Sequence, residues 1–286
     1  MQDQPTRSRP DAATDLPPPG ADALAHSRAL HEHIVRTITE AGGKIPFSRY
    51  MELALYAPAQ GYYSAGAAKF GPEGDFTTAP EISTLFGATL AEGLLPVLDE
   101  LGSDAVLFEP GAGTGAMAAS VLARLAQADR LPAEYQILEV SGDLRERQRR
   151  TLAALPDAVT ARVRWLDKLP EIPFEGVVLA NEVLDALPVE RFRVAENGSA
   201  DIAWVSVAAD TYQVSWEPPP PEVAAPIDQL LSQCRAAGAP LPPGYTSEYC
   251  PGVAAFVMTL SYVLARGAIV LSDYGGTRRE VYLPER

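Results

Sequence analysis

Cysteine and histidine are scarce in this chain of 286 residues. The two cysteines, Cys234 and Cys250, have no metal-binding spacing and imply no disulfide framework. The histidines cluster as His26, His31 and His33, and on a helix the last two would point to different faces. The sequence therefore predicts no metal site, and two reduced thiols in a cytosolic protein.

Long apolar runs are also missing, so we expect no membrane insertion. The N-terminus lacks an apolar signal core and is rich in aspartate, unlike an acid-poor transit peptide, which makes a cytoplasmic location the expectation. Positive charge is in deficit, and the net charge is −14. Such a protein repels phosphate backbones, so nucleic acid is an unfavourable partner and a cationic partner a favourable one. Alternatively, the acidic surface serves only solubility.

The first hundred residues predict a tail followed by a cap. Residues 1–23 are polar and proline-rich and predict a disordered tail. Residues 24–100 predict an N-terminal cap of helices and loops. Its first helix would be capped by Ser27 and stopped by Gly42-Gly43, with apolar residues at every fourth position between them. A second short helix is expected over residues 46–56, before a loop rich in glycine and aromatic residues.

Residues 101–286 alternate between short apolar runs and helical patterns. The runs span residues 105–109, 135–140, 162–166, 176–181 and 267–274. Strands that are apolar throughout and alternate with helices form parallel sheets covered on both faces. Right-handed crossovers then predict an α/β fold, a Rossmann-like doubly wound parallel sheet.

Residues 188–250 interrupt this alternation and read as an insertion. The dipeptide Asn197-Gly198 lies between the strand-like segments 191–194 and 202–205 and predicts a β-hairpin. Two proline-rich stretches follow, before a helix over residues 252–266 and the fifth strand of the parallel sheet.

A glycine-rich loop, Glu109-Pro-Gly111-Ala-Gly113-Thr-Gly115, joins the first parallel strand to its helix. Glycine lets the backbone turn sharply and approach a ligand closely. The helix N-terminus offers free N–H donors to a carboxylate or phosphate, and ligands of open parallel sheets lie at this edge. The position therefore predicts a site for a nucleotide-like cofactor.

The identity of this cofactor has two readings. Residues 111–116 also satisfy the G-x-G-x-x-A fingerprint of NAD-binding proteins. Glu109, however, would oppose a pyrophosphate and favour the ammonium of a bound amino acid. The E-x-G-x-G-x-G form resembles the first motif of class I methyltransferases, which bind S-adenosylmethionine. Glu139 ends the second strand and would hold ribose hydroxyls in either reading. A glycine turn without any ligand is the third possibility.

Polar residues also end the fourth strand, at Asn181, Glu182 and Asp185. Asn181 would face the cofactor. If the chain turns helically here, Glu182 and Asp185 share one face and could hold a guanidinium between two carboxylates as catalytic residues. Methyl transfer is an in-line displacement, which depends strongly on positioning. The alternative is that Asp185 caps a turn and Glu182 is only solvated.

Three further acids are candidates for contacts with the cofactor or the substrate. Asp167 follows the third strand, where it would contact the adenine of the cofactor or serve only as a loop acid. Asp75 and Glu81 would cover the cofactor or the substrate from the N-terminal loop. The neighbouring Tyr62 and Tyr63 fit a packing role equally well.

Several motifs taken together resemble the MidA-like family, which includes the mitochondrial complex I assembly-factor arginine methyltransferase. They lie between residue 27 and the last residue, in the family's order. The motifs are Gly61-Tyr62-Tyr63-Ser64, Gly74-Asp75-Phe76-Thr77-Thr78-Ala79-Pro80-Glu81, Glu139-Val140-Ser141, Asn181-Glu182-Val183-Leu184-Asp185-Ala186-Leu187-Pro188 and Asp273-Tyr274-Gly275. The resemblance implies S-adenosylmethionine as donor and symmetric dimethylation of an arginine on a respiratory complex I subunit.

The resemblance also shows a departure. Members of this family look longer, so we expect the C-terminal strands of the sheet to be missing and the fifth strand to expose an edge. This expectation keeps a second reading open, a binding or assembly factor that holds the cofactor without turnover. An NAD-dependent oxidoreductase is the third reading. The sequence leaves the oligomeric state undetermined.

Overall fold

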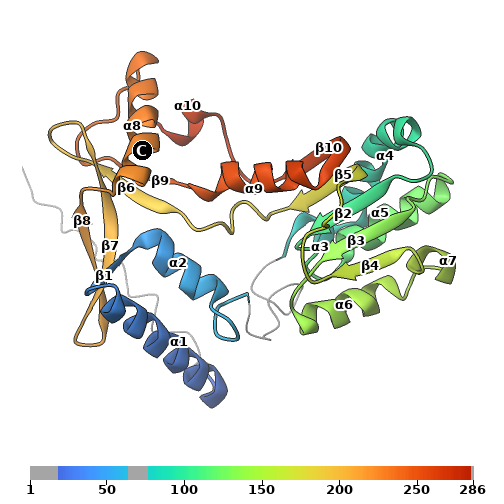
Figure 1. Ribbon diagram of the computed structural model, residues 1–286, viewed down its shortest axis with the longest axis horizontal. Helices are drawn as coiled ribbons and strands as arrows, with labels where there is room; N and C mark the ends of the chain where they lie inside the picture. Colours follow the sequence, from blue (N-terminus) through green and yellow to red (C-terminus); the bar gives the residue numbers. More distant parts are fainter. Residues whose placement is uncertain (1–18, 64–76, 285–286) are drawn as a thin grey trace, which may run out of the picture.

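The computed structural model describes residues 19–63 and 77–284, which form two sheets in two parts of the molecule (Figure 1). One sheet is parallel and lies with its helices at one end of the molecule, whereas the other is antiparallel and lies at the opposite end. The segment after β5 (Phe174–Asn181) and helix α9 (Gly252–Tyr262) are two of the places where the chain passes between the two parts.

The parallel sheet confirms the predicted Rossmann-like fold. Its strands, in spatial order, are β10 (Leu264–Ser272), β5, β2 (Val106–Pro110), β3 (Glu134–Leu138) and β4 (Val163–Leu166). All four pairings are parallel. These strands coincide with the five apolar runs because a strand covered on both faces must be apolar at successive positions.

The two faces of this sheet pack against different helices. Leu107 and Val177 contact the core that includes α4 (Thr84–Leu101) and α5 (Ala116–Gln127). The next residues, Phe108 and Val178, point to the opposite face and pack with α9. Two more helices, α6 (Gly142–Leu152) and α7 (Asp157–Thr160), complete the first layer.

The antiparallel sheet brings together the N-terminus and the insertion. Its strands are β1 (Lys44–Pro46), β6 (Glu190–Val194), β7 (Ala200–Ala208), β8 (Thr211–Glu217) and β9 (Thr246–Tyr249). Strand β7 pairs with β8 along one edge, and β6 and β1 share its other edge. The β6–β7 pair is the hairpin predicted around Asn197-Gly198.

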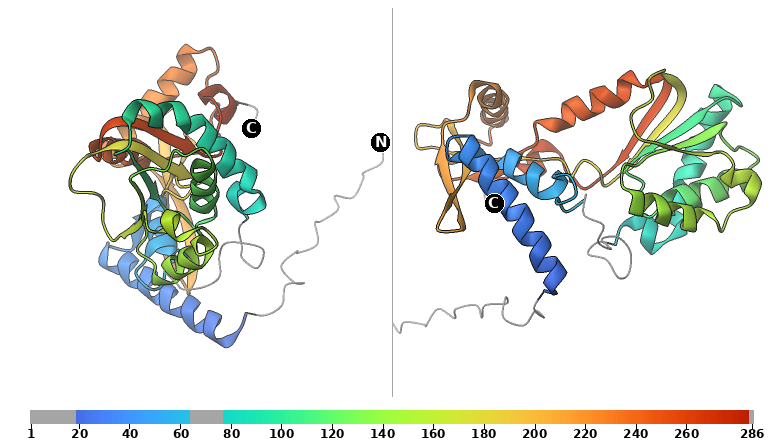
Figure 2. Two further views of the ribbon diagram at one scale, coloured as in Figure 1. Left: turned by 90° about the vertical axis from the view of Figure 1, so that its right-hand side faces the viewer. Right: turned by 60° about the horizontal axis from the view of Figure 1, so that its bottom comes forward.

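Helices cover both faces of the antiparallel sheet. On one face α1 (Ala21–Glu40) and α2 (Phe47–Tyr56) pack on Val205, and on the other face α8 (Pro221–Ala236) packs on Ile202 (Figure 2). The N-terminal helices and the insertion were predicted separately, but they share one core. No helix of the described residues is long and apolar enough to cross a membrane, and no three His, Cys, Asp or Glu of these residues are grouped to hold a metal.

The start of the first helix differs from the prediction. Helix α1 begins at Ala21 after Gly20, so Ser27 lies inside the helix and does not cap it, and residues 21–23 are helical although they were assigned to the tail. The alanine-rich first turn has high helix propensity, and Asp22 is favourable near the N-terminus. The predicted stop is confirmed, because Gly43 donates to Ile38 in a left-handed turn.

The segment predicted as one cap, residues 24–100, divides between the two parts. Helices α1 and α2 belong to the antiparallel part, whereas α4 packs on the parallel sheet through residues such as Ala91 and Leu94. Helix α4 joins the parallel part because its apolar stripe is buried there, in the core that it shares with α5. Between them, α3 (Ala79–Ile82) contacts both α4 and α5.

Strand β10 forms one edge of the parallel sheet among the described residues, where it pairs in parallel with β5. The segment that follows forms α10 (Arg278–Val281), which has a capping box between Thr277 and Glu280. The expectation that further strands are missing beyond β10 stays a prediction.

Close packing at the centre of the parallel sheet gives a stability prediction. A Cβ atom on Gly176 of β5 would lie 1.9 Å from the carbonyl oxygen of Val106 on β2. We expect Gly176→Ala to lower the free energy of unfolding by about 1–3 kcal/mol, because the strands must separate to admit the methyl group. Urea unfolding followed by circular dichroism measures this change.

The control is Gly93→Ala on the exposed side of α4, where nothing lies within 4 Å of the added atom. This variant should be neutral or stabilising by up to about 1 kcal/mol, since alanine has the higher helix propensity. Equal effects of the two substitutions would contradict the packing argument.

Candidate functional site

The polar residues that end β2 and β5 meet at one cavity of about 350 Å³. Its walls come from the glycine-rich loop, the α3 region, the β5–β6 connection and α2, so both parts of the molecule contribute. Four carboxylates line it, from Glu81, Glu109, Glu182 and Asp185, and its described lining contains no lysine, arginine or histidine. The cavity is therefore strongly acidic and suited to cationic groups.

The glycine-rich loop lies where predicted, between β2 and α5. Gly111, Gly113 and Gly115 all have positive φ, with values of 73°, 52° and 85°. Gly115 precedes the first residue of α5, and a Cβ atom there would approach the Cα of Gln148 to 3.2 Å. The loop thus needs glycine for its conformation, and at Gly115 also for its contact with α6.

Glu109 ends β2 and is buried, with 2% of its surface exposed. The hydroxyl of Tyr135 donates a hydrogen bond of 2.6 Å to its Oε2. Burial raises the pKa of Glu109 to about 7, and the bond from Tyr135 only partly opposes this shift. Because Glu109 also lines the cavity, an ammonium group bound there would stabilise its charged form.

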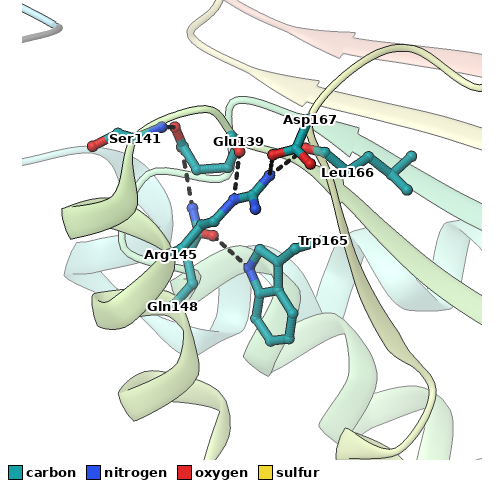
Figure 3. A network of polar contacts seen from close by, with 7 residues as sticks. All are labelled: Glu139, Ser141, Arg145, Gln148, Trp165, Leu166 and Asp167. Atoms are coloured by element: carbon teal, nitrogen blue, oxygen red, sulfur yellow. Dashed lines mark hydrogen bonds and ion pairs between the residues drawn. The ribbon is translucent and has the colours of Figure 1, made fainter.

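Glu139 is buried beside the cavity, within a polar network (Figure 3). Its Oε1 accepts from the amide of Ser141 at 2.8 Å, and its Oε2 accepts from Nε2 of Gln148 at 3.3 Å. Gln148 also donates to the carbonyl of Gly113 at 3.0 Å and accepts from Trp165 at 2.8 Å. Burial raises the pKa of Glu139, against these hydrogen bonds. Gln148 thus couples Glu139 to the glycine-rich loop, although Glu139 is not part of the cavity lining.

Asp167 lies at the outer side of this network and is exposed. Nη2 of Arg145 contacts its Oδ1 at 2.7 Å and donates to the carbonyl of Leu166 at 2.7 Å. Arg145 also donates to the carbonyl of Glu139 at 2.6 Å, so it joins the ends of β3 and β4. Asp167 is likewise outside the cavity lining, and its predicted contact with adenine stays a prediction.

The segment that carries Glu182 and Asp185 differs from the helical turn considered above. Glu182 is left-handed, with φ +51°, and a tight turn closes from Leu187 to the carbonyl of Leu184 at 3.1 Å. Both carboxylates nevertheless line the same cavity, together with Asn181, whose Nδ2 lies 3.4 Å from Oε1 of Glu182. The two side chains therefore reach the same cavity from a turn and not from one face of a helix.

The pKa of Asp185 is raised, first by burial and then by the charge of Asp273, while a bond from the Ala186 amide opposes the shift. Asp273 follows β10 and accepts hydrogen bonds from the amides of Leu184 and Asp185. Sequence reasoning did not place Asp273 in the site. Its position in the sequence could have indicated the site, because Asp273 follows the carboxyl end of a parallel strand, as Glu139 and Glu182 do.

One of the two residues predicted to cover the site, Glu81, lines the cavity. It lies on α3 and accepts a hydrogen bond of 2.5 Å from Oγ1 of Thr114 in the glycine-rich loop. Asp75 lies outside the described residues. Met51, Leu55 and Tyr63 of the α2 region also line the cavity. A packing role and a covering role were both open for Tyr63, whereas nothing local in the sequence indicated Met51 and Leu55.

Known proteins resemble this chain over most of its length. A family described as S-adenosyl-L-methionine-dependent methyltransferases matches residues 89–286. The mitochondrial protein arginine methyltransferase NDUFAF7 of Bos taurus is 30% identical to this chain, over 87% of this chain and 60% of the relative. Its homologue in Drosophila melanogaster is 31% identical, over 68% of this chain and 47% of the relative. The chain thus spans about half to three fifths of these two relatives.

Among solved structures, a protein of Burkholderia thailandensis crystallised with S-adenosyl-homocysteine is 45% identical to this chain. The two structures superimpose with a TM-score of 0.85, over 95% of this chain and 68% of that one. A second structure from the same organism, determined in its native form, gives a TM-score of 0.80 at 45% identity, over 93% of this chain and 66% of that one.

The buried carboxylate of Glu109 gives a pH prediction. Its pKa is about 7 in the folded protein against an ordinary 4.5, so the folded state binds the proton more tightly. The stabilisation from this proton is complete below pH 4.5 and is lost as the pH rises through about 7. We expect Glu109→Gln, which cannot ionise, to gain up to about 3 kcal/mol relative to wild type between pH 4.5 and pH 8.

Urea unfolding at a series of pH values, without added ligand, measures this gain. Glu196→Gln, at the exposed turn between β6 and β7, is the matched control. A difference between Glu109→Gln and wild type that does not change with pH would contradict the argument.

Proposed function

Because the chain belongs to the MidA-like family of S-adenosyl-L-methionine-dependent methyltransferases, we propose that it binds this cofactor in the acidic cavity and methylates arginine in a protein substrate. The family membership confirms the resemblance identified in the sequence. It also favours S-adenosylmethionine over NAD, because the family is defined by the former cofactor. The observation that carries the proposal is the cavity itself, with four carboxylates and no described basic residue.

The residues around the glycine-rich loop fit this cofactor. The start of α5 offers backbone N–H groups to its carboxylate, and Glu109 offers a buried negative charge to its ammonium. Glu139, fixed by Ser141 and Gln148, is the acid for the ribose hydroxyls, and Asn181 faces the cavity from β5. When bound, the cofactor supplies an electrophilic methyl group on a positively charged sulfur, which the acidic cavity stabilises.

The other end of the cavity fits an arginine side chain. Glu182 and Asp185 offer carboxylates to a guanidinium, which can donate two parallel hydrogen bonds to each. Met51 and Leu55 offer apolar surface to the aliphatic stem, and the ring of Tyr63 offers a face to the cation. Holding the nitrogen in line with the methyl group is the main contribution these residues can make.

The finer substrate assignment rests on the resemblance. We propose a subunit of respiratory complex I as substrate, with symmetric dimethylation as the product and the cytoplasm as location. The two relatives named above are protein arginine methyltransferases, which supports an arginine as the target group. The alternative is a cofactor-binding assembly factor that carries out no methyl transfer.

Cofactor binding is tested by Gly113→Arg. Gly113 lines the cavity, has a positive φ and has nothing within 4 Å of an added Cβ atom, so a long side chain would project into the cofactor site. We expect the Kd for S-adenosyl-homocysteine to rise roughly 100-fold or more, in isothermal titration calorimetry. The matched control is Gly93→Arg on the exposed face of α4, which should bind normally. Unchanged affinity of Gly113→Arg, or selective binding of NAD by the wild type, would contradict the assignment.

Methyl transfer is tested by Glu182→Gln, which keeps the shape of the side chain and removes its charge. Transfer from labelled S-adenosylmethionine is measured on protein extract from cells that lack this protein, and mass spectrometry locates methylarginine. We expect the rate to fall roughly 100-fold with cofactor affinity unchanged, because the lost interaction is with the substrate cation. Glu196→Gln is the control. A variant as active as the wild type would refute the role of Glu182, and cofactor binding without methylation by the wild type would favour the assembly-factor alternative.

A further inference from the structure

The turn that presents Glu182 and Asp185 is not stabilised by regular secondary structure. The ladder between β5 and β10 ends with Asn181 opposite Ser272, followed by a bond of 2.8 Å from the Glu182 amide to the Ser272 carbonyl. Glu182 then adopts the left-handed conformation, which costs a residue with a side chain about 1–2 kcal/mol. Other contacts must therefore hold the turn in place.

The carboxylate of Asp273 supplies such contacts. Its Oδ2 accepts from the amides of Leu184 at 2.8 Å and Asp185 at 3.2 Å, and its Oδ1 accepts from the amide of Tyr274 at 2.7 Å. Both oxygens thus accept hydrogen bonds, and the bond from the Leu184 amide joins residues that lie 89 positions apart in the chain. The hydroxyl of Tyr56 on α2 also contacts the turn, because it donates to the carbonyl of Ala186 at 2.7 Å.

Asp273 does not line the cavity, so its effect on a ligand must pass through the turn. We propose that Asp273 is a positioning residue, whose carboxylate bonds the turn amides and thereby fixes the Glu182 and Asp185 side chains at the substrate end of the cavity. Its effect on methyl transfer rests on the proposed function, whereas its effect on the turn does not.

Asp273 also adds negative charge beside Asp185. Among the described residues, Tyr56 and Tyr63 from the α2 region and Asp273 from the end of β10 interact electrostatically with Asp185, and Glu182 lines the same cavity. Burial of Asp185 and the charge of Asp273 together raise the pKa of Asp185. Removing the charge of Asp273 therefore lowers this pKa, so that Asp185 stays ionised to lower pH.

The test compares Asp273→Asn with Asp273→Glu in the full chain. Asparagine has one acceptor oxygen and an NH2 group, so it cannot accept from both sets of amides. Glutamate keeps both oxygens and the charge but moves them by one methylene. We expect both variants to exchange the amide hydrogens of residues 183–187 at least roughly 10-fold faster in mass spectrometry, because the turn opens locally.

Binding and turnover give two further readouts. The Kd for S-adenosyl-homocysteine should change less than about 3-fold in both variants, while kcat for methyl transfer falls roughly 10- to 100-fold. The acidic limb of the pH–rate profile should move to lower pH in Asp273→Asn only, because only this variant removes the charge. A merely structural role would not move that limb.

Asp210→Asn at the exposed turn between β7 and β8 is the matched control, and Tyr56→Phe removes the support from α2 without changing Asp273. Unchanged exchange of residues 183–187 in both Asp273 variants overturns the proposal. Faster exchange with full kcat also overturns it, and leaves the proposed function intact. If the wild type transfers no methyl group, the proposed function fails, and the exchange measurement still decides whether Asp273 holds the turn.

Discussion

The carboxylate of Glu109 is buried at the end of β2, where its pKa rises to about 7 because water is excluded. Tyr135 offers it a hydrogen bond, but no positive charge of the described residues lines the same cavity. The unliganded protein therefore loses stability when Glu109 ionises, and a bound cation would restore that stability. Because the described lining has carboxylates and no basic residue, the cavity favours a ligand that carries positive charge, such as an ammonium and a sulfonium.

The site also depends on both parts of the molecule. The parallel sheet supplies the glycine-rich loop and the acids at its carboxyl edge, as expected for ligand sites of doubly wound folds. The antiparallel part supplies Met51, Leu55 and Tyr63, and Tyr56 bonds the turn that carries Asp185. In the proposed function, the sheet therefore supplies the cofactor end of the cavity and the α2 region forms a wall of the substrate end. The proposal thus expects changes in α2 to alter substrate choice while the glycine-rich loop stays the same.

Much of the fold could be predicted, because the signals are local. Five apolar runs gave the five parallel strands, and Asn197-Gly198 gave the hairpin of β6 and β7. The prediction that Ser27 caps the first helix was wrong, because the alanine-rich turn before Ser27 extends the helix to Ala21. Helix α4 was assigned to the N-terminal cap, because its sequence shows an apolar stripe and does not show which core covers it.

The sequence by itself determined that acids and glycines follow the strands of a parallel sheet, and hence that they meet at one edge, where a cofactor site is predicted. Only the tertiary structure decided the conformation of Glu182 and Asp185, which depends on Asp273 and Tyr56. Only the tertiary structure brought α2 to the cavity. The physical reason is distance along the chain, because hydrophobic periodicity and turn residues report on neighbours within a few positions. Hydrogen bonds between distant segments leave no such periodic signal.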